Sequence, residues 1–305
     1  MNPYEFRFEK LPKPVLSPSD EGFDSKNVYN PAVVKRRGKV VMLYRAEAKR
    51  EKITGRIGLA LSEDGINFIR HPEPVVEPEY KWEGFGVEDP RVVRIGKTYY
   101  MTYTGYDGKT ARLCIATSKN LLNWKKHGVV FEEFPFPKNG VLSWTKSGAI
   151  LTEKMKSGPF EGHYVMYFGD SKVWLAHSKD LIHWEYEREP VLRPRGYLVE
   201  PGPAPILTED GILLIHSEAF HEDGKLVYYT HAALFDREDP RKLIWRTEEP
   251  ILRPTFDWEL YGWVDNVVFA EAMIEHGGRY YLYYGGADRY VGLAIGKIEK
   301  SVKHS

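Results

Sequence analysis

Two adjacent carboxylates, Glu88 and Asp89, are the first residues whose types and spacing could support chemistry. A glycine-rich approach precedes them and Pro90 follows, in the stretch Gly-Phe-Gly-Val-Glu-Asp-Pro-Arg at 84–91. The apolar run at 92–95 is typical of a strand. A residue before proline is restricted to extended or turn conformations, so Asp89 is predicted at the start of that strand. A carboxylate in this place suits contact with a polar ligand, and an Asx-type turn without further role is the alternative interpretation.

Length and composition narrow the class of protein. The chain has 305 residues, of which 42% are hydrophobic and 28% charged, and its formal net charge is zero. This balance argues against a nucleic-acid partner, and the single cysteine, Cys114, argues against a disulfide framework or a thiol metal cluster. The N-terminal residues lack the apolar core of a signal peptide, and no apolar run reaches the roughly 18 residues that a membrane span needs. We therefore expect a cytoplasmic protein without a membrane partner.

One short motif recurs along the whole chain. Its alanines follow one another at intervals of about 60 residues, a period typical of repeat architectures, at Ala60, Ala116, Ala176, Ala233 and Ala294. A tyrosine-rich or aliphatic run precedes each copy, as at 99–103, and a Pro-Val-Leu-like run follows most copies, as at 190–192. Each repeat therefore holds about four short strands rich in β-branched and aromatic residues.

Four strands in each radially repeated unit predict an all-β fold, a five-bladed β-propeller that forms one catalytic domain over residues 1–305. The fifth repeat has no Pro-Val-Leu run after it, whereas an unmatched copy stands at Pro14-Val15-Leu16. We therefore expect the N-terminal strand to complete the last blade and close the ring. Closure would remove exposed strand edges.

In a propeller the innermost strand of each blade lines the central channel, so residues at the mouths of these strands should converge on one axial pocket. The residues predicted at these mouths are Asn30, Asp89, Lys146, Ser147, Glu200, Asp265 and Asn266. The second strands end in Arg45, Thr104, Asp170, His216 and Asp288. A packed channel would not need so many polar groups, but a sugar pocket would.

Cleavage of a glycosidic bond in such a pocket needs an acid for the leaving oxygen and a nucleophile for the anomeric carbon. Water as the nucleophile requires a second carboxylate as base, whereas phosphate requires cations and donors that hold it. The candidate carboxylates are Glu88, Asp89, Glu200, Glu218, Asp265 and Asp288. The candidate cations and donors are Arg45, Arg91, Lys146, His216 and Tyr228.

Several motifs together resemble glycoside hydrolase family 130, the β-mannoside phosphorylase family of five-bladed propellers. They are Gly-Val-Glu-Asp-Pro-Arg at 86–91, Asn30-Pro31, Tyr44-Arg45, Asp-Leu-Ile-His-Trp at 180–184 and Tyr-Tyr-Gly-Gly-Ala-Asp at 283–288. The resemblance covers nearly the whole chain and is to thermophilic bacterial members. The absence of glutamine and the many charged residues also suit a heat-adapted source.

The resemblance implies inverting phosphorolysis of β-mannosides, most simply β-1,4-mannooligosaccharides, to α-mannose 1-phosphate. Asp89 would be the acid and would protonate the leaving oxygen through the 3-hydroxyl of the sugar. The residues implied for substrate binding are Asn30, Arg45, Glu88, Lys146 and Asp288, and those implied for phosphate are Lys146, His216 and Tyr228. Inorganic phosphate is then a co-substrate beside a small oligosaccharide. No cofactor and no metal are expected, and a homo-oligomer is left open.

Two departures from the family pattern favour the alternative, an inverting β-mannosidase-type glycoside hydrolase on the same scaffold. Ser217 and Glu218 follow His216 where the family usually has glycine, and Asp170 stands where it often has a phosphate-binding arginine. A hydrolase would need a base such as Glu200, Glu218 or Asp265. Glu218 should share a strand face with His216, and we expect it to pair with a cation. A sugar-binding propeller without catalysis is a third reading.

Some candidates also have structural explanations. Arg45 could form a surface ion pair, and His216 could be a buried histidine with satisfied hydrogen bonds. Three tryptophans recur at a fixed place in the repeats and are predicted to lie in the core: Trp124, Trp184 and Trp245. Aromatic residues of the long loops are the candidates for stacking on sugar rings; they are Trp82, Phe85, Trp144, Trp258 and Trp263.

Overall fold

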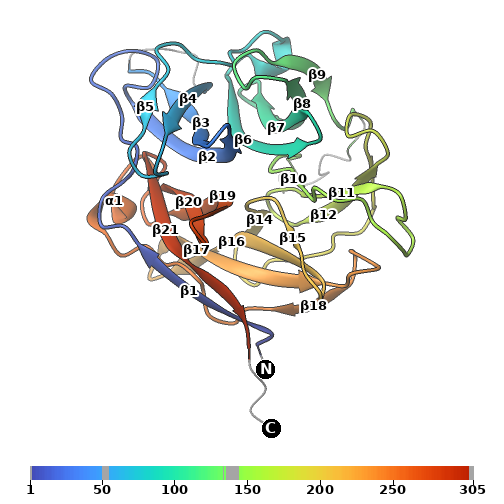
Figure 1. The fold of residues 1–305 in the computed structure, drawn as a ribbon. Helices are drawn as coiled ribbons and strands as arrows, with labels where there is room; N and C mark the ends of the chain where they lie inside the picture. Colours follow the sequence, from blue (N-terminus) through green and yellow to red (C-terminus); the bar gives the residue numbers. More distant parts are fainter. Residues whose placement is uncertain (1, 50–54, 133, 135–143, 302–305) are drawn as a thin grey trace.

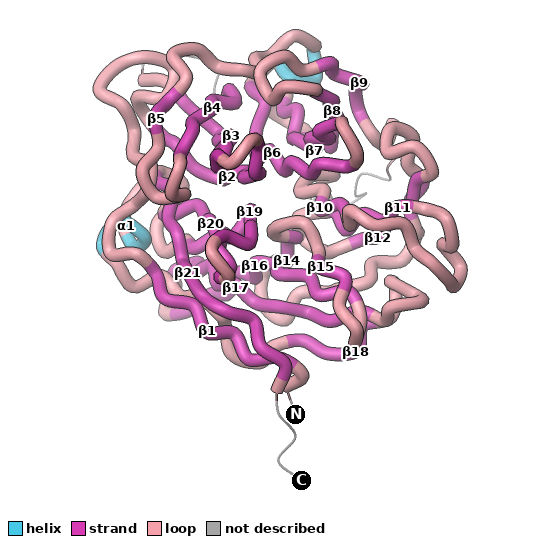
Figure 2. The backbone as a smooth tube through the Cα atoms, in the orientation of Figure 1, coloured by secondary structure: helices cyan, strands magenta, loops and turns pink. Residues whose placement is uncertain are grey.

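Five small antiparallel sheets surround a common axis and form a five-bladed β-propeller, as predicted (Figure 1). The computed structural model describes residues 2–49, 55–132, 134 and 144–301. Figure 2 shows that strands and loops make up nearly all of the described chain. Its helical segments are the 3-10 turn η1 (Lys81–Glu83) and the single turn α1 (Asp257–Leu260). In this described part, no helix has the length and apolar character that a membrane crossing requires.

The blades follow one another in chain order, each with its innermost strand first. Blade 1 contains β2 (Asn27–Arg36), β3 (Lys39–Glu47), β4 (Arg56–Ser62) and β5 (Ile69–Arg70). Blade 2 contains β6 (Gly86–Ile95), β7 (Thr98–Tyr106), β8 (Ala111–Ser118) and β9 (Lys125–Val129). Blade 3 contains β10 (Ala149–Ile150), β11 (Tyr164–Phe168), β12 (Trp174–Ser178) and β13 (Glu185–Tyr186). Blade 4 contains β14 (Leu198–Pro201), β16 (Ile212–Glu222), β17 (Lys225–Phe235) and β18 (Leu243–Arg246), with β15 (Ile206–Leu207) also paired to β16. Blade 5 contains β19 (Val268–His276), β20 (Arg279–Gly286), β21 (Tyr290–Lys300) and β1 (Tyr4–Lys10).

The hydrophobic core lies between neighbouring blades. Leu43 and Ile57 of blade 1, for example, share one buried cluster with Val92 and Met101 of blade 2. The central strands are therefore covered on both faces, which explains why they are apolar runs and not alternating patterns. This packing leaves the ends of the innermost strands β2, β6, β10, β14 and β19 around the axis (Figure 1).

The N-terminal segment closes the ring, as predicted. Val15 donates its backbone N–H to the Val291 carbonyl at 2.8 Å, and Leu16 forms an antiparallel bridge with the same residue. The longer part of the closure was not predicted: β1 pairs with β21 from Tyr4 opposite Lys300 onward. The polar and apolar residues of β1 alternate and do not match the blade repeat, which predicts an N-terminal strand only from residue 14.

Three blades share a buried link that fastens the preceding loop to the sheet. In each, a tyrosine hydroxyl of the second strand donates to a buried carboxylate, which also pairs with a cation of the outermost strand. The three sets are Tyr44–Asp24–Arg70, Tyr103–Glu83–Lys126 and Tyr284–Glu259–Lys10. Because β1 supplies Lys10 for blade 5, it occupies the same place as the outer strands of blades 1 and 2.

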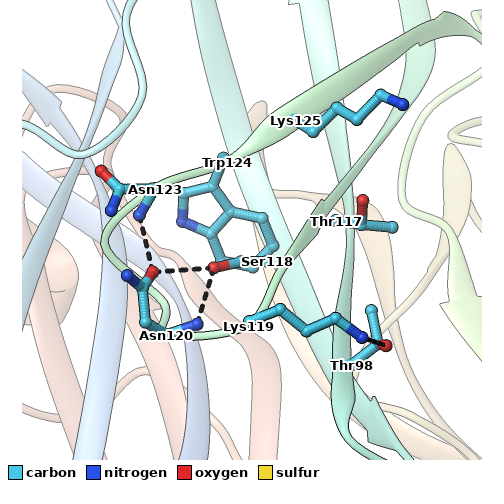
Figure 3. A pocket seen from close by; sticks show the side chains of 8 residues that line it. All are labelled: Thr98, Thr117, Ser118, Lys119, Asn120, Asn123, Trp124 and Lys125. Carbon is cyan, nitrogen blue, oxygen red and sulfur yellow. Dashed lines mark hydrogen bonds between the residues drawn. The ribbon is translucent and has the colours of Figure 1, made fainter.

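The recurring Ser-x-Asn/Asp motif forms a compact turn after the third strand of a blade. Figure 3 shows this turn in blade 2, where the backbone N–H of Asn120 donates to Ser118 Oγ at 3.1 Å. The indole of Trp124 donates to the Leu121 carbonyl at 3.0 Å. Trp184 makes the same contact in blade 3 and is 7% exposed. Trp184 therefore lies in the core, as expected, whereas Trp124 and Trp245 are partly buried and pack against core clusters. The hollow of about 470 Å³ beside the turn therefore belongs to the scaffold.

Phe8→Ala should weaken the closure measurably. Phe8 lies on β1 and packs, partly buried, against the core of blade 5. We expect a loss of about 2 kcal/mol in the free energy of unfolding, roughly half the cost for a fully buried phenylalanine. Chemical denaturation measures this change. Arg7→Ala is the matched control, because the Arg7 side chain is 69% exposed, and equal effects of the two substitutions would contradict the closing role.

Candidate active site

Left-handed backbone conformations mark the inner ends of four blades. Asn30, Asp89, Ser147 and Asn266 have φ angles of 49°, 50°, 58° and 60°. Asparagine and aspartate adopt this region more readily than most residues. In β2 and β6 the left-handed residue also sits in a β-bulge, a feature that re-aims side chains and is frequent beside active sites.

Asp89 lies inside β6 and not at the start of the strand, so this part of the sequence prediction was wrong. Residues 86–88 already pair with β7 before the bulge. Pro90 favours a strand boundary in the sequence, but a proline is tolerated within a strand at a bulge because no ladder hydrogen bond is lost there.

The Asp89 carboxylate joins three blades and is only 2% exposed. Asn30 Nδ2 donates to its Oδ1 at 2.8 Å, and Arg45 Nη1 lies 3.2 Å from the same oxygen. Lys146 Nζ lies 3.5 Å from Oδ2. Burial alone would raise the pKa of Asp89, but Arg45 and Lys146 outweigh it and hold the pKa well below its usual range. Asp89 is therefore ionised at neutral pH.

Arg45 is the cationic centre of the blade 1 side, and not a surface ion-pair partner. Its Nη2 lies 3.0 Å from both Glu47 Oε1 and Glu88 Oε1, and its guanidinium covers the Tyr29 ring at 4.7 Å. Burial raises the pKa of Glu88 to about 7, although Arg45 opposes this and Asp89 adds to it. Glu88 therefore exchanges its proton near neutral pH, while Asp89 does not.

Lys146 bridges Asp89 to the blade 4 side. Its Nζ lies 3.2 Å from Glu200 Oε1, and Ser147 Oγ donates to the same carboxylate. Burial raises the pKa of Glu200 against the pull of Lys146. Burial also raises the pKa of Asp170 to about 7, again against Lys146. At neutral pH, Asp170 therefore carries only part of the negative charge that the sequence suggested.

Asp288 and Tyr228 belong to the same electrostatic cluster. Burial raises the pKa of Asp288 to about 7, and Arg45 is the largest opposing influence. Burial also raises the pKa of Tyr228, and the Glu200 and Asp288 charges add to this. The Tyr228 phenol consequently stays protonated and is a neutral donor.

Arg91 connects the inner strands beside the site, whereas the sequence predicted it only as a possible phosphate-binding cation. It is 5% exposed, and its Nη2 donates to the Pro201 carbonyl at 2.7 Å and lies 3.2 Å from Glu271 Oε1. Arg91 therefore ties β6 to β14 and β19. Sequence reasoning missed Glu271, although a lone charged residue inside the apolar run Val-Phe-Ala-Glu-Ala-Met was a usable signal.

His216 and Glu218 face the interior of blade 4, beside different partners. His216 is fully buried and stacks on His231 with ring centroids 6.0 Å apart. Burial, followed by the charges near it, lowers the pKa of His216 well below its usual value, so the ring is neutral. Glu218 is bound by Arg195 through contacts of 3.0 and 3.2 Å, as expected for cation pairing. Asp265 is exposed and accepts a hydrogen bond from Gly262 in its own loop.

An aromatic cleft of about 340 Å³ opens above Arg45, Glu88 and Lys146. Phe85, Tyr106, Trp144 and Trp263 line its walls. Of these, Trp263 is 61% exposed and Phe85 46%. Two other loop aromatics expected to stack on sugars are part of the scaffold instead, because Trp82 packs on Tyr80 and Trp258 packs on Tyr284.

Several buried polar atoms around the axis have no hydrogen-bond partner in the described part of the chain. They are Asn30 Oδ1, Arg45 Nε, Thr104 Oγ1, Asp170 Oδ1 and Ser217 Oγ. Buried polar groups are normally paired with protein or solvent. Arg45 also lines the aromatic cleft, and Thr104 and Ser217 lie opposite Glu88 and Glu200 on the neighbouring strands. Unpaired donors and acceptors beside an aromatic cleft suit a polar ligand with an apolar face, as a sugar has.

Comparison with known proteins places the chain in a family. The family model described as beta-1,4-mannooligosaccharide phosphorylase, glycoside hydrolase family 130, matches residues 5–304. A 1,2-beta-oligomannan phosphorylase of Thermoanaerobacter sp. (strain X514) is 40% identical over 93% of this chain and 94% of its own length. A beta-1,2-mannobiose phosphorylase of the same strain is 38% identical over 97% of this chain and 99% of its own length.

A solved structure extends the comparison. It is described with the statement that the GH130 family of mannoside phosphorylases contains glycoside hydrolases that target beta-1,2 mannosidic linkages in Candida mannan. It shares 34% identity with this chain, covers 95% of it and 93% of its own chain, and superposes with a TM-score of 0.86.

The fold and the site thus define a glycosidase-like propeller enzyme that acts on sugars. The chain belongs to glycoside hydrolase family 130, a family of mannoside phosphorylases, which confirms the resemblance found in the sequence.

Proposed function

We propose that the chain cleaves β-mannosides with inorganic phosphate, with inversion, and releases α-mannose 1-phosphate. The observation that supports this most is the Asp89 carboxylate held by Asn30, Arg45 and Lys146 beneath the aromatic cleft. One acid, cationic side chains and neutral donors are what phosphorolysis needs. A second, free base is unnecessary because phosphate is already anionic.

The substrate we propose has β-1,2-linked mannosyl units. The sequence favoured β-1,4 linkages, and the description of the family model agrees with that. The two relatives at 40% and 38% identity, however, are phosphorylases of β-1,2-linked mannosides. Because they match this chain over nearly its whole length, we weight their linkage above the general family description.

Asp89 must carry a proton when the glycosidic bond breaks, although Arg45 and Lys146 favour its ionised form. Phosphate bound near Lys146 and Arg45 would take up part of their positive charge, so the pKa of Asp89 would rise. Hydrogen phosphate also carries the proton that the reaction needs. Its oxygen bonds to C1, the C1–O bond to the leaving sugar breaks, and its proton ends on the leaving hydroxyl by way of Asp89.

Lys146 and Tyr228 are the groups best placed to receive phosphate in this proposal, with His216 as a neutral donor. Carboxylates outnumber cations around them among the described residues, which opposes an anion. Glu88, Asp170 and Asp288 reduce this opposition, because burial raises the pKa of each to about 7. We therefore place the favourable range for phosphate binding at or below neutral pH.

The test is cleavage of β-1,2-mannobiose and β-1,4-mannobiose across a series of phosphate concentrations. We expect a saturable rise with phosphate, equal amounts of mannose and α-mannose 1-phosphate, and faster turnover of the β-1,2 dimer. Full activity without phosphate, with two free mannoses per cleavage, would reject phosphorolysis. A preference for the β-1,4 dimer would reject only the proposed linkage.

An inverting β-mannosidase is the second candidate function. It is supported by the excess of carboxylates and by the similar solved structure, whose description says that the family also contains glycoside hydrolases. Of the three candidate bases, Glu200 alone lies in the Asp89 cluster. Glu218 is bound by Arg195, and Asp265 is exposed. Glu200→Gln would abolish phosphate-free hydrolysis if this function holds.

Trp263→Ala should weaken substrate binding more than it slows the chemical step. Trp263 lines the cleft and is 61% exposed. Lys26 Nζ covers one face of its ring, 3.8 Å from the centroid, which leaves the opposite face for a sugar. Loss of one aromatic contact should raise the KM for mannobiose up to about tenfold, with a smaller change in kcat. Tyr261→Ala is the matched control, since Tyr261 is 66% exposed in the same loop and does not line the cleft. Unchanged KM in Trp263→Ala would remove this ring from the sugar site.

A further inference from the structure

A second buried charge cluster lies in blade 4, around Glu218 of β16. Glu218 is fully buried, and Arg195 from the loop before β14 holds it with two parallel contacts. Nε lies 3.0 Å from Oε2, and Nη2 lies 3.2 Å from Oε1. Arg246 Nη1 is more distant, at 3.7 Å from Oε1. Arg195 is therefore the main partner that balances this carboxylate.

The guanidinium of Arg195 is itself fixed in place. Its Nη1 donates to the Thr247 carbonyl at 2.7 Å, and its Nη2 lies 3.1 Å from His231 Nδ1. The side chain is 25% exposed, so it closes the cluster from the solvent side. A planar, bidentate contact of this kind fixes the direction of the carboxylate as well as its charge.

The cluster reaches the expected phosphate ligand through His216. His216 Nδ1 lies 3.8 Å from Glu218 Oε1, beyond hydrogen-bond distance. Neither ring nitrogen of His216 has a hydrogen-bond partner in the described part of the chain, although the ring is fully buried. Glu218 held by Arg195 therefore leaves a neutral imidazole that still has an N–H to donate.

We propose that Arg195 is a positioning residue that selects phosphate over water by holding Glu218 away from His216 and out of reach of a water molecule. This inference rests on the proposed phosphorolysis. With Arg195 in place, the carboxylate is balanced and His216 can donate to phosphate. Without Arg195, Glu218 either repels phosphate at His216 or accepts a proton from a nucleophilic water.

The effect of removing Arg195 should differ from that of a purely structural defect. The charged and titratable groups that face Glu218 are Arg195, Arg246, His216 and His231. A structural defect would weaken the binding of sugar and phosphate alike. An unbalanced Glu218 carboxylate would weaken the binding of the phosphate anion selectively, and replacing Glu218 by glutamine would relieve that effect.

The experiment compares Arg195→Met, Arg195→Lys, Glu218→Gln and the double variant Arg195→Met with Glu218→Gln. Arg193→Met is the control, because Arg193 is exposed and its Nη2 lies 3.5 Å from Oε2 of Glu189, itself an exposed residue. Each is assayed on β-1,2-mannobiose for the KM of phosphate, for kcat, and for mannose released without phosphate. The wild type in the same assay tests the proposed function separately.

For Arg195→Met we expect a phosphate KM about tenfold higher, which corresponds to one unbalanced charge nearby, with a smaller change in kcat and some phosphate-free release of mannose. Arg195→Lys should lie between this variant and the wild type. Glu218→Gln should bind phosphate at least as well as the wild type. The double variant should return the phosphate KM to near the wild-type value.

Three outcomes would overturn the inference while the proposed function stands. One is a soluble Arg195→Met enzyme with an unchanged phosphate KM and no phosphate-free release. Another is a double variant whose phosphate KM stays as high as that of Arg195→Met; this double variant also decides the case if the single variant fails to fold. The third is a loss of phosphorolysis in Glu218→Gln. If the wild type itself needs no phosphate, the proposed function fails instead.

Discussion

Asp89→Asn is expected to lower kcat for mannobiose phosphorolysis by about 10²–10⁴-fold, the usual contribution of general acid catalysis. The substituted side chain keeps the shape of Asp89, and its carbonyl oxygen can still accept the hydrogen bond that Asn30 now donates at 2.8 Å. It cannot carry the proton to the leaving oxygen. The change should therefore appear in kcat far more than in the KM for the sugar.

The leaving group provides the control for this prediction. An aryl mannoside with a strongly acidic phenol needs little protonation, so Asp89→Asn should retain most of its activity on that substrate. Glu88 is the competing acid, because burial raises its pKa to about 7 and it lines the cleft. Near-full activity of Asp89→Asn on mannobiose, together with an inactive Glu88→Gln, would transfer the role of acid to Glu88.

The fold could be predicted from the sequence because each sequence repeat corresponds to one blade of the propeller. Each blade has to bury both faces of its middle strands, so the tyrosine-rich runs and the alanine motif recur at a nearly constant spacing. The turn at Ser118 and its equivalents recurs with them, since the side chain of Ser118 satisfies backbone N–H groups. Closure by the N-terminal segment followed from the missing fifth copy at the end of the chain.

Parts of the site could also be predicted, where a local motif fixes the backbone. Asn30 and Asp89 both precede a proline, both have a left-handed φ, and they meet across two blades at 2.8 Å. The partners of Arg91 and Glu218 could not be predicted, because Glu271 comes from a distant repeat and Arg195 from a loop of blade 4 whose spacing no other repeat shares. The ionised state of Asp89 depends on charges from three blades, and a list of residues cannot give their distances.

The same limit applies to the charge balance of the pocket. Asp170 in the sequence suggested added negative charge, but burial raises its pKa to about 7. For Glu218 the sequence left a free base as the alternative to the expected cation pairing, and Arg195 binds both of its oxygens. Whether a carboxylate opposes phosphate is thus decided by its burial and its partner, and neither is visible in one sequence.

Lys146→Met is expected to raise the KM for phosphate by roughly 10–100-fold, since a hydrogen bond to a charged group is worth about 1.5–3 kcal/mol. Lys146 Nζ lies 3.5 Å from Asp89 Oδ2 and 3.2 Å from Glu200 Oε1. Because neither carboxylate is in close contact with the ammonium, Lys146 can also bind phosphate. Lys146→Arg, which keeps the charge, should lose less. Lys119→Met is the control, because Lys119 lies in the peripheral hollow of blade 2 (Figure 3).

The pH profile gives a second, independent readout of Lys146→Met. Lys146 favours the ionised form of Asp89 and so lowers its pKa. Removing that positive charge should raise the pKa of Asp89, and the protonated form that donates to the leaving oxygen should persist to higher pH. The alkaline limb of kcat should therefore move upward in pH even as phosphate binding weakens. A variant with an unchanged phosphate KM and an unchanged alkaline limb would show that Lys146 contacts neither phosphate nor the acid during turnover, and phosphorolysis at this site would lose its main cation.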